Sequence, residues 1–380
     1  MDYTSNDFST RAVHAGRIDD HTAGSVVNPM YLSTTFERNA EGEIGPKGYV
    51  YSRMANPNRT ALEKILANLE GGREAFAFAS GMAAVDAVFQ TVLKPGDHLI
   101  VPDDNYHGVT HLLKSHYPNW KVSFDAVDMS DLKILEGALR PNTVMILAET
   151  PSNPLLKITD LSAVAKLAKS RNIITACDNT WASPYLTRPL EHGMDIVIHS
   201  STKYFGGHSD IIGGAVIIGT NDDLGQRLKN YQSVAGAVPS PFDCWLLVRS
   251  IATLPLRMEK QCASAMFIAE QLKQHIAIEK VFYPGLPQHN NHDVARLQMK
   301  NGFGGMLSVL VKGGQAEALR FASRLKLFRH ATSLGGVESL IEHRLSAEGV
   351  NAKSPANLLR ISVGIEDPGD LIRDMMQAVG

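Results

Sequence analysis

Apolar positions between about residue 47 and residue 240 follow two alternating patterns. Short runs rich in Val, Ile, Ala and Phe alternate with stretches in which apolar residues recur every three to four positions. The runs are typical of buried strands, and the periodic stretches are typical of amphipathic helices. The alternation predicts an α/β fold, with a mostly parallel central sheet flanked by helices. Strands are expected over residues 74–79, 98–101, 121–127, 143–148, 173–177, 195–199 and 215–219.

The two flanks of this region have different patterns. Residues 1–46 are rich in Gly, Asn, Thr and acidic residues, which predicts an arm rather than a domain. After Pro239-Ser240-Pro241, a long helical segment over residues 242–275 precedes a looser mixture of helix and strand patterns. We therefore expect an arm (1–46), an α/β domain (47–240) and a smaller C-terminal α+β domain (241–380).

Composition narrows the possible partners. The 380 residues carry a formal net charge of -2, which provides no electrostatic basis for binding nucleic acid or an anionic membrane. Three widely spaced cysteines do not resemble a secreted disulfide framework, so a reducing compartment is expected. The N-terminus lacks the pattern of a signal peptide, and no apolar run reaches the roughly 18 residues of a membrane span. These features predict a cytoplasmic protein.

A candidate anion site follows the first predicted strand. Ala79-Ser80-Gly81-Met82 leads from that strand into a predicted helix over residues 82–93. The N-terminus of such a helix offers free backbone N–H groups and the positive end of the helix dipole, which suit a phosphate. Any tight turn between a strand and a helix also favours small residues. Taken alone, the motif therefore favours a purely structural interpretation.

Two other strand ends carry ionisable side chains. Asp178 ends the apolar run from residue 173, where a buried carboxylate needs a cation or hydrogen bonds, although it could also simply cap a helix. Lys203 follows another strand and the hydroxyl cluster Ser200-Ser201-Thr202. Apolar surroundings favour the neutral amine, which is the nucleophile that forms Schiff bases. The alternative is a lysine whose stem is buried and whose amine only extends to solvent.

Together, these three features match the needs of one cofactor, pyridoxal 5'-phosphate (PLP). A phosphate cradle, an acid to hold the pyridinium proton and an amine for the aldehyde are what PLP requires of a protein. Three independent coincidences in this order are improbable. We therefore predict that the α/β domain binds PLP.

Longer motifs also resemble the Cys/Met-metabolism (trans-sulfuration) family of PLP enzymes. The resemblance is carried by residues 177–184, CDNTWASP, and by residues 200–210, SSTKYFGGHSD. It extends over nearly the whole chain, from TRAVHAG at residues 10–16 to LRISVG at residues 359–364. The family implies PLP fold type I and an enzyme of amino-acid metabolism.

The resemblance also assigns roles to individual residues. Lys203 would bind the cofactor aldehyde, and Asp178 would pair with the pyridine nitrogen. The remaining roles are Ser80, Gly81, Met82, Ser200 and Thr202 at the phosphate, Tyr106 stacked on the ring, Asn153 at the 3'-oxygen, Tyr51 and Arg53 at a neighbouring subunit's phosphate, and Ser333, Leu334 and Arg360 at the substrate carboxylate. Sites shared between subunits would require a homo-oligomer, and the resemblance implies a dimer of dimers in which the N-terminal arm (1–46) contributes to the subunit interface. Tyr51, Tyr106 and Arg360 could instead be ordinary packed or ion-paired residues.

The histidines do not indicate a metal site. His107, His199 and His208 lack a spacing typical of metal ligands, and we interpret them as polar loop residues or residues behind the site.

The family resemblance predicts elimination or replacement at the γ carbon of a small L-amino acid derived from homoserine or homocysteine. Lys203 would act as the base and Tyr106 as the acid. The alternatives are a β-lyase acting on a carbon–sulfur bond, as cystathionine β-lyases do, a different PLP reaction such as transamination or racemisation, and a pseudo-enzyme that only binds.

Two positions depart from patterns in the family. Gly108 stands where methionine γ-lyases typically carry Cys, which argues against that activity. Thr332 stands where the family's cystathionine enzymes usually carry a Glu that holds a distal ammonium. Thr332 therefore argues against cystathionine as the preferred substrate and favours an O-acylhomoserine or a similar compound.

Overall fold

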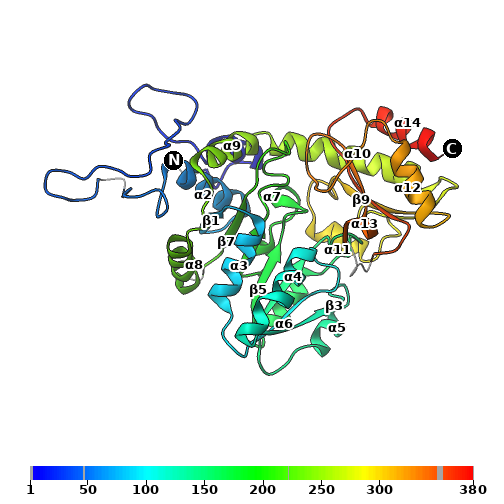
Figure 1. The fold of residues 1–380 in the computed structure, drawn as a ribbon, viewed down its shortest axis with the longest axis horizontal. Helices are drawn as coiled ribbons and strands as arrows, with labels where there is room; N and C mark the ends of the chain where they lie inside the picture. Colours follow the sequence, from blue (N-terminus) through cyan, green and yellow to red (C-terminus); the bar gives the residue numbers. More distant parts are fainter. Residues whose placement is uncertain (1–2, 46–47, 221, 349–353, 380) are drawn as a thin grey trace.

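The computed structural model describes residues 3–45, 48–220, 222–348 and 354–379, which form two sheets with flanking helices (Figure 1). The expected boundary between residues 46 and 47 lies outside the described residues. The expected division into an arm and two domains remains a prediction.

The larger sheet has seven strands in the order β1-β7-β6-β5-β4-β2-β3. β7 pairs antiparallel with β1 and β6, and the other four pairs are parallel, which confirms the predicted mostly parallel sheet. The strands are β1 (Glu74–Phe78), β2 (His98–Pro102), β3 (Ser123–Val127), β4 (Thr143–Glu149), β5 (Ile174–Asp178), β6 (Ile196–His199) and β7 (Gly214–Ile218).

Both faces of this sheet are covered because successive side chains on each strand point to opposite faces. One face packs against α3, α4 and α8, and the other against α2, α6, α9 and α10. The helices in this part of the chain are α2 (Pro57–Glu70), α3 (Gly81–Val92), α4 (His107–Ser115), α5 (Leu132–Gly137), α6 (Leu161–Lys169), α7 (Ser183–Leu186) and α8 (Asp222–Ala235). Two 3-10 turns cover Tyr117–Trp120 and Pro189–His192.

The C-terminal part contains a five-stranded sheet in the order β10-β11-β12-β9-β8. Its strands are β8 (Ile278–Phe282), β9 (Met306–Val311), β10 (Arg329–His330), β11 (Leu340–His343) and β12 (Leu358–Ser362). Its helices are α9 (Pro241–Ile251), α10 (Leu254–Lys273), α11 (His292–Gln298), α12 (Gln315–Arg324), α13 (Arg344–Glu348) and α14 (Pro368–Val379). This mixture agrees with the expected α+β pattern.

The long helix expected over residues 242–275 is wrong as a single element. The chain forms α9 and α10, which are separated at Ala252 and Thr253. Pro255 is the second residue of α10 and has no backbone N–H to continue the hydrogen bonds of α9. The proline therefore ends one helix and begins the next.

The N-terminal region contains a helix that its composition did not predict. α1 (Phe8–His14) packs against α2, and Arg11 Nε donates a hydrogen bond of 2.7 Å to Asn68 Oδ1. The following described residues form loops that extend away from the body of the chain (Figure 1). An extended segment of this kind is compatible with an arm, and its place at a subunit interface remains a prediction.

A buried polar contact joins the end of α2 to the sheet. His199 Nε2 lies 2.5 Å from Glu70 Oε1, and Asn179 Nδ2 donates to the same oxygen at 2.8 Å. His199 is a buried residue at the end of β6, inside the strand expected over residues 195–199. Of the two interpretations made from sequence, the polar loop is wrong, and a place behind the site stays a prediction. This contact anchors β6 immediately before the segment that carries Lys203.

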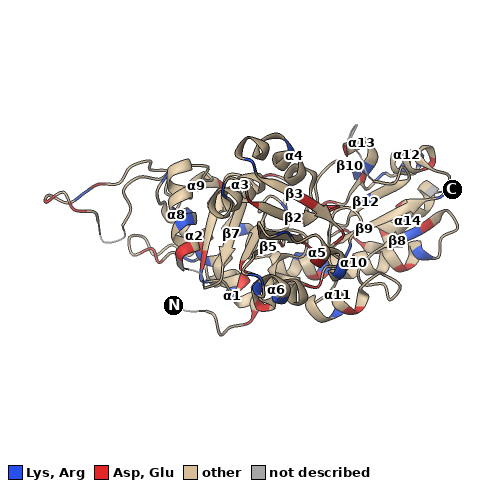
Figure 2. Cartoon of the chain, turned by 90° about the horizontal axis from the view of Figure 1, so that it is seen from below, with Lys and Arg blue, Asp and Glu red and all other residues tan. Residues whose placement is uncertain are grey.

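The surface carries charges of both signs. Figure 2 shows acidic and basic residues interspersed along the helices of both parts of the chain. Among the described helices, none combines the length and apolar character that crossing a membrane requires.

Candidate active site

A cavity of about 320 Å³ lies at the carboxyl ends of β5 and β6 and is bounded by the loop before β11. It gathers the candidate site residues from both sheets, apart from Tyr51 and Arg53. The predicted residues that line it are Ser80, Gly81, Met82, Tyr106, Asn153, Asp178, Ser200, Thr202, Lys203, Thr332, Ser333, Leu334 and Arg360. This position is the usual ligand site of open α/β sheets.

Lys203 lies where the two sheets meet. Its Nζ donates a hydrogen bond of 2.8 Å to Ser333 Oγ, which belongs to the loop between β10 and β11. Burial, together with the positive charge of Arg360, lowers the pKa of Lys203 to about 8. The neutral amine, which a nucleophile or base requires, is therefore formed more readily than in an ordinary exposed lysine.

Asp178 ends β5 and points its carboxyl group at the same cavity. Burial raises the pKa of this carboxyl group, while hydrogen bonds from Thr180 lower it. The backbone N–H of Thr180 donates to Asp178 Oδ1 at 2.9 Å. A carboxylate in this environment is stabilised by a cationic hydrogen-bond donor, such as a protonated ring nitrogen.

The candidate anion site at the N-terminus of α3 is closely packed. Ser80 caps the helix, with its hydroxyl accepting a hydrogen bond of 3.0 Å from Ala83 N–H. A Cβ atom on Gly81 would lie 2.8 Å from Ser200 Cβ, so the close approach requires glycine. Thr202 also lines the cavity, but its hydroxyl already pairs with Gly213 through both its lone pair and its proton. Ser200 therefore supports a phosphate role more directly than Thr202.

Tyr106 is held by a residue from β4. Its backbone N–H donates to Glu149 Oε2 at 2.8 Å, and Glu149 is itself buried. Burial and the nearby Asp178 raise the pKa of Glu149 well above its usual range. The Tyr106 side chain remains 39 % exposed and lines the cavity, so the ring can contact a ligand there.

Arg360 is a buried arginine whose hydrogen bonds converge on the cavity wall. It donates to Asn153 Oδ1 at 3.2 Å and to the backbone oxygen of Ser333 at 3.1 Å. Glu342 lies 2.7 Å from its Nη2 and supplies the opposite charge. Ser333 has φ of 103°, a conformation that a non-glycine residue rarely adopts. The same strained serine thus contacts both Lys203 and Arg360.

The structure places Tyr51 and Arg53 outside this cavity. Tyr51 is 42 % exposed, and the guanidinium carbon of Arg53 lies 5.8 Å from its ring centroid. Arg53 donates to the backbone oxygen of Ser233. Within one chain these two residues therefore form a surface pair, and their role in a neighbouring subunit's site remains a prediction.

Sequence reasoning missed several residues that line the cavity: Val85, His107, Glu149, Thr180, Trp181, Ile212 and Arg344. Thr180 and Trp181 directly follow Asp178 in the chain, so their place after a strand was a usable signal. Arg344 gave no comparable signal because it lies between the recognised motifs and belongs to neither. In the structure it begins the short helix α13.

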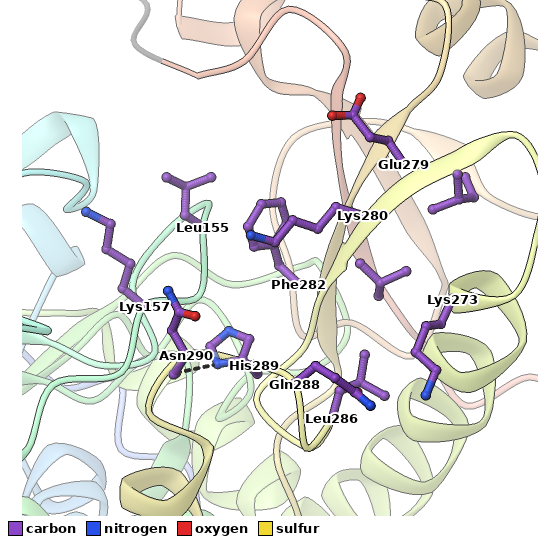
Figure 3. A pocket seen from close by; sticks show the side chains of 12 residues that line it. Leu155, Lys157, Lys273, Glu279, Lys280, Phe282, Leu286, Gln288, His289 and Asn290 are labelled. Carbon is purple, nitrogen blue, oxygen red and sulfur yellow. Dashed lines mark hydrogen bonds between the residues drawn. The ribbon is translucent and has the colours of Figure 1, made fainter.

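A second cavity, also of about 320 Å³, lies beside β8 (Figure 3). Lys280 is placed over the ring of Phe282, with its Nζ 4.7 Å from the ring centroid. Lys157 forms ion pairs with Asp103 and Asp128, at 2.9 and 2.8 Å. The cavity lacks a paired nucleophile and acid among the described residues that line it, so its chemistry is less suited to catalysis.

The first cavity meets the chemical requirements of PLP. It supplies a helix N-terminus for the phosphate, the Asp178 carboxyl for the ring nitrogen and the Lys203 amine for the aldehyde. The raised pKa of Asp178 and the lowered pKa of Lys203 are both consequences of burial, and a cationic ring and an aldehyde are the partners that these groups need. The residues present therefore fit the cofactor.

Comparison with known proteins identifies relatives over almost the full chain. The family model "Cys/Met metabolism PLP-dependent enzyme" matches residues 9–380. A cystathionine gamma-synthase of Mycobacterium tuberculosis is 45% identical, and the match covers 98% of this chain and 96% of the relative's length. A cystathionine beta-lyase of Coxiella burnetii is 44% identical over 97% of both chains.

A solved structure shows the same fold. The crystal structure of metB from Corynebacterium glutamicum superposes with a TM-score of 0.96 at 45% identity, covering 100% of this chain and 99% of that chain. Sequence and fold therefore agree with the chemistry of the cavity. The chain belongs to the Cys/Met-metabolism family of PLP-dependent enzymes.

Proposed function

We propose that this enzyme catalyses elimination or replacement at the γ carbon of an L-amino acid derived from homoserine or homocysteine. The observation that carries the proposal is the contact of Lys203 with Ser333, because it places a buried amine of lowered pKa beside Arg360. A base thus lies next to the group that would hold the substrate carboxylate. Bound PLP would supply an electron sink for the negative charge that develops at the substrate Cα.

Substrate positioning is assigned to Arg360. Its planar guanidinium can bind the α-carboxylate through two parallel hydrogen bonds. Asn153 and the backbone of Ser333 fix the orientation of the guanidinium, and Glu342 balances its charge. This arrangement would hold the substrate Cα near Lys203.

Proton transfer is assigned to Lys203 and Tyr106. The Lys203 amine would remove the Cα proton, and γ chemistry would require it to remove a Cβ proton afterwards. Ser333 Oγ accepts a hydrogen bond from this amine and would orient it for both steps. The Tyr106 hydroxyl would protonate the leaving group, and the Glu149 contact to its backbone would keep the ring over the cavity.

A β-lyase is the second candidate because relatives of nearly equal identity carry different names. The Coxiella burnetii relative, named a cystathionine beta-lyase, is 44% identical, whereas the Mycobacterium tuberculosis relative, named a gamma-synthase, is 45% identical. Identity therefore does not choose between the two reactions. β-elimination needs only the Cα deprotonation by Lys203, so both reactions are compatible with the same base.

The substrate preference that we propose rests on Thr332 and Gly108. Thr332 lines the cavity with a neutral hydroxyl and provides no charge for a distal ammonium. A Cβ atom at Gly108 would lie 2.5 Å from Tyr106 Cε1, so a cysteine there would displace the ring. Both positions support an O-acylhomoserine or a similar γ-substituted compound over cystathionine and methionine.

We also propose a homo-oligomer, a dimer of dimers, in which Tyr51 and Arg53 reach a neighbouring subunit's phosphate. Their exposure and the extended N-terminal loops support this assembly. We propose a cytoplasmic location because Cys177, Cys244 and Cys262 are all buried and unpaired, as is typical of a reducing compartment.

The direct test of the reaction is product identification by mass. The enzyme would be incubated separately with O-succinylhomoserine, O-acetylhomoserine, L-cystathionine and L-methionine, each with and without cysteine. We expect an O-acylhomoserine to give 2-oxobutyrate without cysteine and cystathionine with it. Pyruvate and homocysteine from cystathionine, without turnover of an O-acylhomoserine, would establish the β-lyase instead.

Thr332→Glu should raise relative activity on cystathionine. A charge-assisted contact to the distal ammonium is worth roughly 1.5 to 3 kcal/mol, which corresponds to about one to two decades in kcat/KM. Thr332→Gln has a similar size without the charge and should leave the preference nearly unchanged. A wide preference of the unmodified enzyme for cystathionine would mean that another residue holds the ammonium.

Hybrid subunits test the shared site. Arg53→Ala and Lys203→Ala should each be inactive, and mixed dimers should recover about a quarter of the wild-type activity, because half of them are hybrids with one intact site. Asp178→Ala mixed with Lys203→Ala is the control, since both changes affect the same subunit's half of each site. Recovery is measured after the subunits have been exchanged and the hybrids verified. If verified hybrids that carry Arg53→Ala recover no more activity than the control, Arg53 does not contribute to the neighbouring subunit's site.

Gly81→Ala should weaken retention of PLP. The added Cβ would lie 2.8 Å from Ser200 Cβ, and overpacking of this kind costs about 1 to 3 kcal/mol, or roughly 5- to 150-fold in the dissociation constant. Gly137→Ala is the matched control, because nothing lies within 4 Å of an added Cβ there. The loss of cofactor absorbance on dialysis measures the effect. Equal retention by the two variants would place the phosphate elsewhere.

A further inference from the structure

Arg344 is a second buried arginine in the wall of the active-site cavity, and the mechanism described above does not use it. Its side chain is 5% exposed, and it lines the cavity together with Lys203 and Arg360. Removing an arginine from water is costly unless its donors are satisfied. Its position therefore requires an explanation.

Arg344 and Arg360 are linked by one carboxylate. Glu342 Oε2 lies 2.7 Å from Arg344 Nη1 and 2.7 Å from Arg360 Nη2, so the two nitrogen atoms lie within twice that distance of each other. A single carboxylate thus serves two guanidinium groups. The Arg344 group lies beside the one that would hold the substrate α-carboxylate.

The contacts of Arg344 do not use all of its N–H groups. A guanidinium has five N–H groups, and here Nη1 faces Glu342 while Nη2 lies 3.2 Å from Glu348 Oε1. Among the described residues, no acceptor reaches the buried Nε. The unused N–H groups can donate hydrogen bonds to a planar oxyanion such as a carboxylate.

Arg344 also stands between the active-site cavity and an adjoining one. The adjoining cavity has a volume of about 240 Å³ and shares Arg344, His107 and Asn153 with the active-site cavity. A substrate held at Arg360 could therefore extend its side chain past Arg344 into this space. The two cavities together offer room for a γ-substituent longer than an acetyl group.

The acidic groups in the adjoining cavity already have partners. Asp103 pairs with Lys157 at 2.9 Å, and Asp104 accepts a hydrogen bond of 2.5 Å from Ser152 Oγ. Glu348 faces Arg344 and accepts from Ser354 Oγ at 2.6 Å. These partners reduce the competition between the acidic groups and an incoming anion for the remaining donors of Arg344.

We propose that Arg344 is a specificity-determining residue that binds a second carboxylate, carried by the substrate's γ-substituent. The inference rests on the proposed γ chemistry and names the substrate class for it. The carboxylate can come from two sources, the free end of a dicarboxylic acyl group or the distal amino-acid group of a thioether. Both present the same planar oxyanion to the guanidinium, and substrates that lack it gain nothing from Arg344.

The test compares Arg344→Gln with the unmodified enzyme on three substrates. O-Succinylhomoserine carries a distal carboxylate, cystathionine carries a distal carboxylate and ammonium, and O-acetylhomoserine carries neither. We expect kcat/KM on O-succinylhomoserine to fall about 10- to 100-fold, mainly through KM, and activity on O-acetylhomoserine to stay within about threefold. If Arg344 also binds the distal carboxylate of cystathionine, kcat/KM on cystathionine should fall by a similar factor to that on O-succinylhomoserine.

The ratio between substrates separates recognition from a structural role. If Arg344 only positions Glu342 and Arg360, activity on all three substrates should fall equally, because all three carry the α-carboxylate. That result would overturn the proposal. The ratio is independent of the folded fraction, so partial destabilisation does not obscure it. Arg344→Lys keeps the charge but loses the planar fork, and should give a smaller change in the same direction.

Arg320→Gln provides the matched control. Arg320 lies on α12, is 56% exposed and makes an ion pair with Glu317, so it offers the same substitution away from the cavity. The ratio between O-succinylhomoserine and O-acetylhomoserine should not change in this variant. A change equal to that of Arg344→Gln would show a general effect of lost charge and contradict the proposal.

Calorimetry with simple acids keeps the inference separate from the proposed reaction. Succinate can bridge Arg360 and Arg344, whereas butyrate offers one carboxylate on a chain of similar length. We expect the PLP-loaded enzyme to bind succinate about tenfold or more tightly than butyrate, and Arg344→Gln to remove the difference. If no γ-substituted substrate reacts, the proposed function fails, while this comparison still decides the role of Arg344. Equal affinities in the unmodified enzyme would overturn it.

Discussion

The contact between the Lys203 amine and Ser333 Oγ is the interaction on which the site depends. Lys203 follows β6 of the larger sheet, whereas Ser333 lies in the loop before β11 of the smaller sheet. The amine is buried where the two sheets meet, and burial lowers its pKa to about 8. Burial between the two sheets thus contributes to the lowered pKa of the proposed nucleophile.

The same serine connects Lys203, on the proposed cofactor side of the cavity, to Arg360, on the proposed substrate side. Its backbone oxygen accepts a hydrogen bond from Arg360, which also donates to Asn153 in the loop after β4. Glu342 then links Arg360 to Arg344. Substrate recognition and base positioning are consequently parts of one connected set of hydrogen bonds.

Sequence could predict the part of this site that depends on local pattern. Asp178 ends one apolar run, Lys203 follows another after three hydroxyl residues, and Gly81 opens a helix after a third. Their positions at the sheet edge therefore follow from the α/β alternation. The family motifs added Arg360 and Ser333. The structure brings these five residues into one cavity, and their roles there remain predictions.

Features that depend on packing between distant segments could not be predicted. The burial of His199 against Glu70 joins residues far apart in the chain, and nothing near His199 identifies that partner. Arg344 reaches the cavity only because β11 pairs with β12, which brings Glu342 opposite Arg360. The exposure of Tyr51 also depends on where the segment that carries it lies relative to the rest of the chain.

The central claim is that Lys203 is the residue that binds PLP. It is tested most directly by reconstituting the enzyme with PLP, reducing it with borohydride and mapping the pyridoxyl-modified peptide by mass. Reduction fixes the cofactor to the amine to which it is bound. The account predicts one modified lysine per chain, at Lys203. Modification at another lysine of the folded enzyme, or no stable incorporation, would contradict it.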